Sequence, residues 1–281
     1  MDQLIAFSEA YPLLWCGALA VLGLLIGSFL NVVIHRLPIM LEIQWRDEAA
    51  LSADGDVQVA QARYDLWWPR SHCPHCQQPI AVRNNVPVLG WLLLRGRSRC
   101  CHQPIAWRYP LVEAVTGILF VAAGSLWPPG VSLLGALVLL SFLIALAAID
   151  AETLLLPDAL TLPLLWLGLF INLSDAFVPL ESAVIGAMAG YLALWMVYWM
   201  FKTLTGKDAL GAGDFKLLAA LGAWLGWQAL PQLVLLAALG GLVVTCLWRW
   251  RRGGDFEQPL AFGPWLAVSG GILLFVPGFS F

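Results

Sequence analysis

Charged residues are scarce in this chain: 12% of its 281 residues are Asp, Glu, Lys or Arg, whereas 60% are hydrophobic. A water-soluble domain of this length needs a far more polar surface, so the composition excludes that class of protein. The sequence also lacks a stripe of interleaved basic and aromatic residues, and nothing in it indicates a nucleic-acid partner. Mean hydropathy is +0.79, which is typical of a chain that crosses a membrane several times.

The N-terminal stretch MDQLIAFSEAYPLLW has no basic residue ahead of its apolar run. A cleaved secretory signal begins with a basic segment, so we expect a retained membrane span here. Hydrophobic runs near 20 residues predict eight spans in all. The predicted spans are residues 12–34, 110–127, 131–150, 156–173, 180–201, 213–229, 231–249 and 260–279.

A long polar segment, residues 35–109, separates the first span from the second. We therefore expect an all-α polytopic membrane protein surrounded by lipid, with residues 1–34 as the first transmembrane helix, residues 35–109 as a small domain and residues 110–281 as a seven-helix domain. Cytoplasmic loops are enriched in Lys and Arg. If the N-terminus lies outside, all 15 Lys and Arg residues fall on the cytoplasmic side. We thus expect residues 35–109 in the cytoplasm and both chain ends outside.

Two aspartates lie at the same predicted membrane boundary. Asp150 ends the third span, in ALAAIDAETLLLPD, and Asp214 begins the sixth, in GAGDFKLLAALGAWLG. A carboxylate within a span is costly, so it is a functional candidate by default. Two carboxylates a few ångströms apart cannot both ionise readily, and the pair would share one proton. One would accept a proton from water while its protonated partner polarises a peptide carbonyl, as in aspartic proteolysis.

The same residues allow simpler interpretations. Asp214 could be only the N-cap of its helix, and Asp150 only a solvated residue at the interface, because Asp is a favoured cap. The glycines fit the catalytic interpretation better. Gly211 and Gly213 would permit unusual backbone dihedrals and the close approach of an extended substrate.

Two further charged residues flank this boundary. Lys216 would either pair with Asp214 or extend its amine to the lipid headgroups. Asp158 directly follows Pro157 and is interpreted as the cap of the fourth span. Lys216, like the two glycines, is expected to support the active site.

The stretch around Asp214 resembles a family signature. GAGDFKLLAALGAWLG is similar to the motif of the prepilin peptidases, the type 4 leader peptidases of the membrane aspartic protease class. The resemblance extends along most of the chain and places the two catalytic aspartates on Asp150 and Asp214. Its other stretches are GSFLNVVIHRLP (27–38), CPHC (73–76), NNVPVLGWLLLRGR (84–97), WRYPLVE (107–113), LPD (156–158) and FGPWLA (262–267).

The resemblance implies a bifunctional enzyme of the bacterial inner membrane. The orientation that the Lys and Arg residues favour would then place both chain ends in the periplasm. The enzyme's substrates would be type IV prepilins or type II secretion pseudopilins, whose short basic leaders are cut at the cytoplasmic face. Many members then methylate the new N-terminal amine with S-adenosylmethionine. This second activity rests on resemblance alone, because the chain has no glycine-rich Rossmann fingerprint.

Glu113, at the start of the second span, is a candidate contact for the amine or the cofactor. The simpler interpretation is a glutamate that the helix dipole stabilises. Either role would leave a carboxylate close to the membrane surface.

Four of the six cysteines lie in the 35–109 segment: Cys73, Cys76, Cys100 and Cys101. The cytoplasm disfavours disulfides, and a CxxC pair such as CPHC can hold two corners of a zinc tetrahedron. The resemblance implies a second CxxC, but Ser98 stands at its first position and Cys100 is additional. We expect a structural zinc site formed by the four cysteines, against the alternative of a metal-free loop. Alternative fourth ligands are His72, His75 and His102.

Other functions remain open at this point. A peptidase without methyltransferase activity would keep the same aspartates. A proton-coupled transporter would carry its acids near the middle of the bilayer, whereas Asp150 and Asp214 are predicted at one surface. A presenilin-like protease would carry a Tyr-Asp pair, but Ile149 precedes Asp150.

Overall fold

The computed structural model describes residues 2–53, 64–73, 75–81, 86–207, 211–252 and 261–276. In these ranges the chain is predominantly helical, and β-structure is limited to two isolated bridges, His72 with Pro79 and Arg97 with Pro104. The all-α expectation is confirmed. The chain forms two compact units, Leu13–Ala122 and Met1–Pro12 with Ala123–Phe281.

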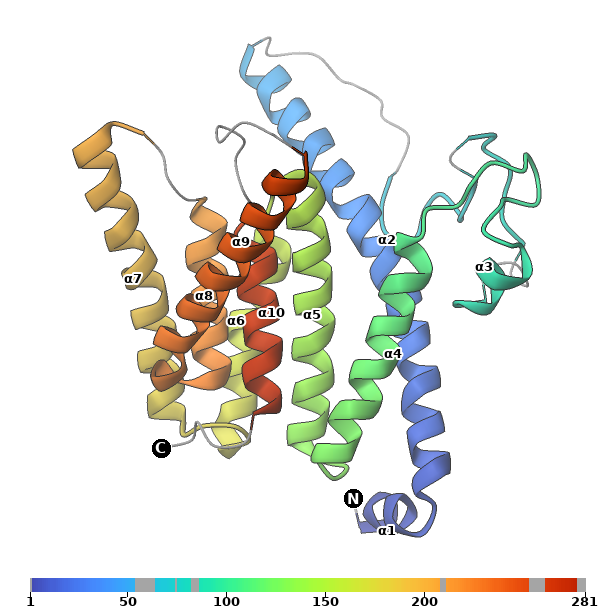
Figure 1. Cartoon of the computed structure of the whole chain (residues 1–281), viewed down its shortest axis with the longest axis horizontal. Helices are drawn as coiled ribbons and strands as arrows, with labels where there is room; N and C mark the ends of the chain where they lie inside the picture. The colour runs from blue at the N-terminus through green and yellow to red at the C-terminus, as the bar shows by residue number, and fades with distance from the viewer. Residues whose placement is uncertain are drawn as a thin grey trace. The chain divides into compact units, whose positions relative to one another are not determined.

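The Leu13–Ala122 unit is built on one long helix, α2 (Pro12–Ala53), which is drawn in blue in Figure 1. It has 42 residues and continues well past residue 34, where the first span is predicted to end. Pro38 lies inside it and removes one backbone hydrogen bond. The following residues are mostly good helix formers such as Leu, Glu, Gln, Arg and Ala, so the helix continues. A shorter helix not predicted from the sequence, α1 (Asp2–Ala10), precedes it in the chain.

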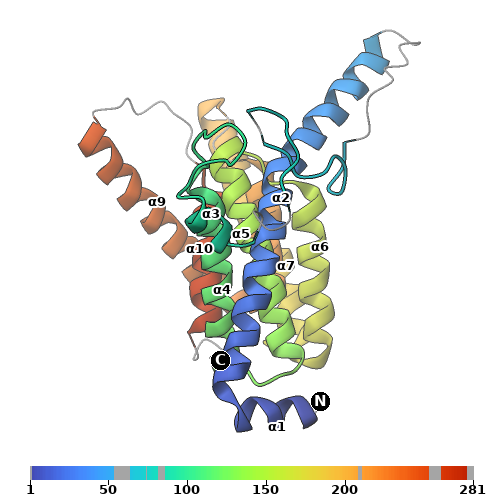
Figure 2. The ribbon, with the colours of Figure 1, turned by 90° about the vertical axis from the view of Figure 1, so that its right-hand side faces the viewer.

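α4 (Arg108–Leu126) packs closely against α2 through small residues, and the two helices lie side by side in Figure 2. A Cβ at Gly23 would lie 2.7 Å from Gly117 Cα, and a Cβ at Gly27 would lie 2.7 Å from Glu113 Cα. Small residues four positions apart let two helix backbones approach each other in a membrane. This packing fixes Glu113 beside α2. The short helix α3 (Leu89–Leu93) lies in the segment that joins the two.

The other unit contains a bundle that runs from yellow-green to red in Figure 1. Its longer helices are α5 (Val131–Thr153), α6 (Asp158–Ile171), α7 (Leu180–Thr205), α8 (Ala212–Leu225), α9 (Leu230–Arg252) and α10 (Gly263–Phe275). α8 packs against α6, α7 and α10. Every residue from Asp214 to Trp224 is buried except Lys216, which is partly exposed. The first turn of α8 therefore brings a carboxylate into the interior of the bundle.

Side-chain hydrogen bonds join α8 to α6. Trp224 is fully buried, and its Nε1 donates to the Leu164 carbonyl at 2.8 Å. Asn172 Nδ2 donates to the Ala223 carbonyl at 2.9 Å. Lipid offers no hydrogen-bond partner, so polar groups within a membrane bundle must find theirs in the protein. These bonds hold the end of α8 that lies away from Asp214.

Five of the described helical segments are long and apolar enough to cross a membrane: Pro12–Ala50, Arg108–Leu126, Val131–Thr153, Leu180–Thr205 and Trp227–Leu247. α6, α8 and α10 are shorter, with 14, 14 and 13 residues. At 1.5 Å per residue they measure about 20 Å, against about 30 Å for the hydrocarbon core. Each of the eight predicted spans nevertheless coincides with one helix. The predicted class, a polytopic helical membrane protein, is confirmed.

Candidate active site

Asp150 lies in the last turn of α5 and is 5% exposed. α5 ends shortly afterwards because Leu154 adopts a left-handed conformation and donates its N–H to the Asp150 carbonyl at 2.9 Å. The backbone N–H of Gly263, at the start of α10, faces the Asp150 carboxylate. Asp150 Oδ2 has no hydrogen-bond partner among the described residues. It is a buried acceptor whose hydrogen-bonding capacity the described residues leave unused.

Asp214 is the third residue of α8 and is 7% exposed. The N-cap of α8 is Gly211, whose carbonyl accepts the Asp214 N–H at 3.1 Å. The interpretation of Asp214 as the N-cap is therefore wrong. Asp214 instead lies within the first turn of the helix, at the positive end of the helix dipole.

α5 ends and α8 begins at the same end of the bundle (Figure 1). Asp150 in the last turn of α5 and Asp214 in the first turn of α8 therefore lie at that end. They are close enough for their charges to interact. A Cβ at Gly263 would lie 2.6 Å from Asp150 Oδ2 and 3.1 Å from Leu156 Cδ1. Leu156 comes from the turn between α5 and α6 and also contacts Gly213. The starts of α8 and α10 and the turn after α5 therefore enclose the carboxylates.

The glycines beside Asp214 provide space rather than unusual dihedrals. Gly211 has φ −76° and ψ 144°, which is ordinary extended backbone, and Gly213 is not among the glycines with positive φ. The expectation of unusual dihedrals is wrong at both positions. A Cβ at Gly213 would lie 2.6 Å from Leu156 Cβ, whereas one at Gly211 would lie 3.5 Å from Asp214 Oδ2. Close backbone approach thus requires glycine at Gly213 and not at Gly211.

Lys216 pairs with a carboxylate that the sequence interpretation did not consider for it. Its Nζ lies 2.6 Å from Asp158 Oδ1 and 2.8 Å from Asp158 Oδ2. The structure therefore pairs Lys216 with Asp158 and not with Asp214. Asp158 is the first residue of α6, and the N-cap is Pro157, so Asp158 is not the predicted cap. The ion pair joins the starts of α6 and α8.

The four cysteines of the Leu13–Ala122 unit lie together. Their Sγ atoms are all within 4.8 Å of one another, with Cys73 and Cys101 at 3.6 Å and Cys76 and Cys100 at 3.2 Å. Zn–S bonds of about 2.3 Å place the sulfurs of a tetrahedral site about 3.8 Å apart, so this donor set fits zinc. Among the described residues, no histidine belongs to the cluster.

The cysteine cluster is built from two copies of one loop. Residues 71–80, SHCPHCQQPI, align with residues 96–105, GRSRCCHQPI. The third residue of each copy, Cys73 or Ser98, donates its N–H to the carbonyl of the eighth residue, at 2.9 and 2.8 Å. The seventh residue of each copy has a positive φ, 59° and 56°. The shared ending Gln-Pro-Ile was a signal of this repeat that the sequence interpretation missed.

The repeat explains how the cluster accommodates Ser98. Position for position, Ser98 replaces Cys73, and Cys101 matches Cys76. Cys100, directly before Cys101, brings the number of sulfurs to four. Ser98 Oγ lies 3.1 Å from Cys101 Sγ, so a sulfur at position 98 would also reach the cluster.

Two cysteines of the cluster, Cys73 and Cys76, hold their protons unequally. The backbone N–H groups of Cys76 and His75 lower the pKa of the Cys73 thiol to about 6, although burial opposes them. The backbone N–H of Gln78 lowers the pKa of Cys76, but neighbouring sulfurs, Cys100 first, raise it to about 12. The Cys73 thiolate therefore forms at lower pH than the Cys76 thiolate. A metal ion bound here would displace the remaining protons.

Glu113 is the sixth residue of α4 and is 8% exposed, so it does not lie in the first turn as the dipole interpretation required. Its Oε2 accepts the backbone N–H of Val88 at 2.7 Å. Val88 has φ 58°, which is rare for a β-branched residue. The Ser28 side chain also lies beside the Glu113 carboxylate. Glu113 is thus a buried carboxylate anchored by its neighbours.

Comparison with known proteins divides the chain into two parts. A family model described as the bacterial peptidase A24 N-terminal domain matches residues 21–127, and one described as the type IV leader peptidase family matches residues 137–246. A protein of Pectobacterium carotovorum subsp. carotovorum, called prepilin leader peptidase/N-methyltransferase, is 62% identical over 280 residues and covers 100% of both chains. This chain belongs to the type IV leader peptidase family.

Two more relatives carry the same name as the Pectobacterium protein. The Dickeya chrysanthemi protein is 60% identical over 278 residues, which are 98% of each chain. The Aeromonas hydrophila protein is 52% identical over 275 residues, 98% of this chain and 95% of that one. No solved structure matches the chain.

The leader peptidase family model covers Asp150 and Asp214, while the N-terminal model covers Glu113 and the cysteine cluster. The two candidate sites therefore belong to different parts of a leader peptidase. Leu156 and Gly263 enclose the aspartates, and neither was predicted as a site residue. Both lie in stretches that carry the family resemblance, LPD and FGPWLA, but a sequence stretch does not show which carboxylate its residues contact.

Proposed function

We propose that this leader peptidase removes the leader peptide from prepilins, with Asp150 and Asp214 as its catalytic pair. The observation that carries the proposal is that two buried carboxylates, far apart in the sequence, meet at one end of a helical bundle. One carboxylate accepts a proton from water while the other donates a proton to the oxygen of the scissile carbonyl. The water oxygen bonds to the carbonyl carbon, and the C–N bond breaks as the leaving amine gains a proton.

The neighbouring residues support this pair without taking part in proton transfer. Gly213 lets the start of α8 approach Leu156. We propose that an extended peptide runs along Gly211, beside Asp214. Lys216 holds the start of α8 to Asp158. We propose that these contacts set the direction in which Asp214 faces Asp150.

The proposed setting is the bacterial inner membrane, with the aspartates on the cytoplasmic side and both chain ends in the periplasm. The distribution of the 15 Lys and Arg residues supports this orientation. Residues 1–34 would then provide the first transmembrane helix, residues 35–109 the cytoplasmic domain and residues 110–281 the peptidase domain. A prepilin or pseudopilin in the same membrane would present the junction of its basic leader and apolar helix at this surface.

We propose that the four cysteines hold a structural zinc ion through their thiolates. The separations of the four sulfur atoms support a tetrahedral site. Its role would be to join the two loop copies, because each contributes two sulfurs.

The second proposed activity is N-methylation of the cleaved product, as the names of the relatives suggest. S-Adenosylmethionine would be the cofactor, and it supplies a methyl group carried on a positively charged sulfur. The chain must then hold the cofactor beside the new amine and keep that amine unprotonated. We propose Glu113 as a contact of this cofactor, because it is a buried carboxylate in the part of the chain that holds the cysteines.

Incubation of the purified enzyme with a prepilin, with and without S-adenosylmethionine, tests both activities. Mass spectrometry of the product N-terminus should show loss of the leader in both reactions. An added methyl group should appear only in the reaction that contains S-adenosylmethionine. Cleavage without methylation would favour the alternative, a peptidase that lacks methyltransferase activity. An uncleaved prepilin would overturn the proposed function.

A further inference from the structure

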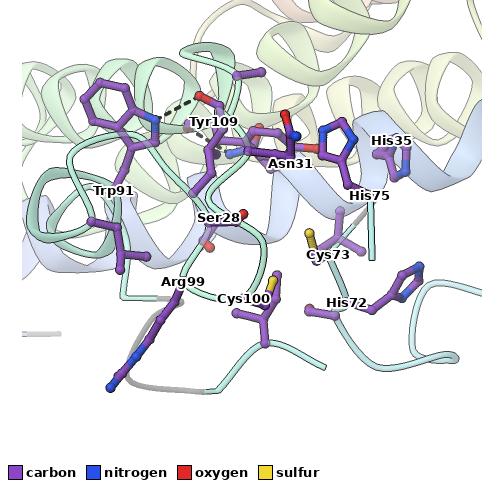
Figure 3. Close-up of a pocket in the computed structure, with 18 of the residues that line it drawn as sticks. Ser28, Asn31, His35, His72, Cys73, His75, Trp91, Arg99, Cys100 and Tyr109 are labelled. Atoms are coloured by element: carbon purple, nitrogen blue, oxygen red, sulfur yellow. Dashed lines mark hydrogen bonds between the residues drawn. The ribbon is translucent and has the colours of Figure 1, made fainter. Parts of the chain in front are cut away.

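A cavity of about 660 Å³ lies within the Leu13–Ala122 unit. α2 and α4 line one side of it, and the two copies of the cysteine loop line another. Figure 3 shows Asn31, Trp91 and Tyr109 together at one side, with Cys73, Cys100 and His72 across from them. Cavities of this size commonly enclose a cofactor-sized molecule.

Two buried polar side chains, Asn31 and Glu113, line this cavity. Asn31 is 4% exposed, and its Nδ2 donates to the Tyr109 carbonyl at 3.0 Å. Its Oδ1 is buried and, within the described part of the chain, has no hydrogen-bond partner. A buried acceptor without a donor is costly, so a ligand that donates to it would be stabilised. Glu113, the other buried polar side chain, also lines the cavity.

Aromatic rings supply the apolar part of the cavity. Trp91 Nε1 donates to the Ile105 carbonyl at 3.2 Å, and its ring packs against Gly96, where a Cβ would lie 2.9 Å from Trp91 Cζ2. These contacts hold the ring in one orientation. Tyr109 lines the same cavity. A planar heterocycle and a positive charge are both favoured next to aromatic faces.

We propose that this cavity is the S-adenosylmethionine site, with Glu113 facing the positive sulfonium and Asn31 Oδ1 accepting an N–H of the cofactor. This assignment rests on the proposed methylation and deepens it. A single ligand then satisfies the carboxylate, the unpartnered amide oxygen and the aromatic surface. The two loop copies form a wall of the cavity. By joining them, the cysteine cluster would stabilise the cofactor site as well as the fold of the loops.

Equilibrium dialysis of the purified full-length protein with radiolabelled S-adenosylmethionine tests the assignment. Glu113→Gln should weaken binding at least about tenfold, because truncating one partner of a buried charge pair is costly. S-Adenosylhomocysteine has a neutral sulfur, so its affinity should change much less in this variant. Asn31→Leu, which removes the acceptor, should weaken both ligands equally. Glu42→Gln, on the exposed part of α2, is the matched control and should bind as the wild type does.

Zinc content and leader cleavage, measured on the same preparations, show that each variant has folded. Wild-type affinity for both ligands in folded Glu113→Gln and Asn31→Leu would overturn the site assignment while leaving methylation intact. Failure of the wild-type protein to bind or methylate would overturn both the site and the methylation. Leader cleavage would stand in either case, so the failures are distinguishable.

Discussion

Lys216 Nζ lies 2.6 Å from Asp158 Oδ1, so one ion pair links the first residue of α6 to the first turns of α8. The pair is only partly shielded, since Lys216 is 29% and Asp158 57% exposed. Such pairs contribute about 1 kcal/mol or less to stability. Asp214 precedes Lys216 by two residues on the same helix. The ion pair therefore holds the part of α8 that carries Asp214.

We expect Lys216→Met to lower the rate of leader cleavage about tenfold while Tm falls by less than about 4 °C. The reason is that the variant releases the start of α8 from α6 and lets Asp214 move relative to Asp150. Cleavage kinetics and thermal unfolding of the purified variant measure the two effects. Lys207→Met removes an exposed lysine that precedes α8 and should cleave normally. Equal rates in the two variants would show that the ion pair does not position Asp214.

Gly263→Ala should reduce the rate of leader cleavage by about a hundredfold or more. This is the lower end of the rate enhancement that a general acid or base provides, and a displaced Asp150 would no longer provide it. The new methyl group would lie 2.6 Å from Asp150 Oδ2 and would displace the carboxylate. Gly271→Ala on the same helix is the matched control, because a Cβ there meets no described atom within 4 Å. Retention of wild-type kcat in Gly263→Ala would contradict the enclosure of Asp150 by the start of α10.

The wild-type protein should contain about one zinc ion per chain. Cys100→Ala should contain less zinc than that. Ser98→Cys added to that variant should restore it, because position 98 repeats position 73 and reaches the cluster. Metal analysis by mass spectrometry measures both. Cys246→Ala, outside the cluster, serves as the control and should keep its zinc. A Cys100→Ala protein with full zinc would exclude Cys100 as a ligand.

Removal of zinc with a chelator should speed amide hydrogen exchange in residues 64–107 and leave the bundle of α5 to α10 protected. Among the described residues, the two loop copies make few backbone hydrogen bonds outside themselves, so the metal would supply much of their stability. Leader cleavage should persist, because both aspartates lie in the other unit. Hydrogen-exchange mass spectrometry and a parallel cleavage assay check this. Uniform exchange with and without zinc would indicate that the loops fold without metal.

The spans and the two aspartates were predictable because a lipid environment leaves a long apolar run little choice but a helix, and a carboxylate in such a run stands out. The partner of Lys216 was not predictable, since it depends on how the turn after α5 places Asp158. The extension of α2 beyond residue 34 was missed because residues 35–53 carry helix formers without an apolar run. The loop repeat was hidden by Ser98, which breaks the CxxC pattern.

The central claim is that Asp150 and Asp214 together perform the hydrolysis. The most direct measurement is leader cleavage by Asp150→Asn and by Asp214→Asn, each purified and shown to be folded by its zinc content and Tm. Each variant should lose activity by about a hundredfold or more, because an amide cannot exchange the proton. Asp175→Asn should be fully active, since Asp175 is exposed, lies in the loop between α6 and α7 and has a left-handed conformation that Asn also adopts. Wild-type cleavage by either of the first two variants would contradict the account.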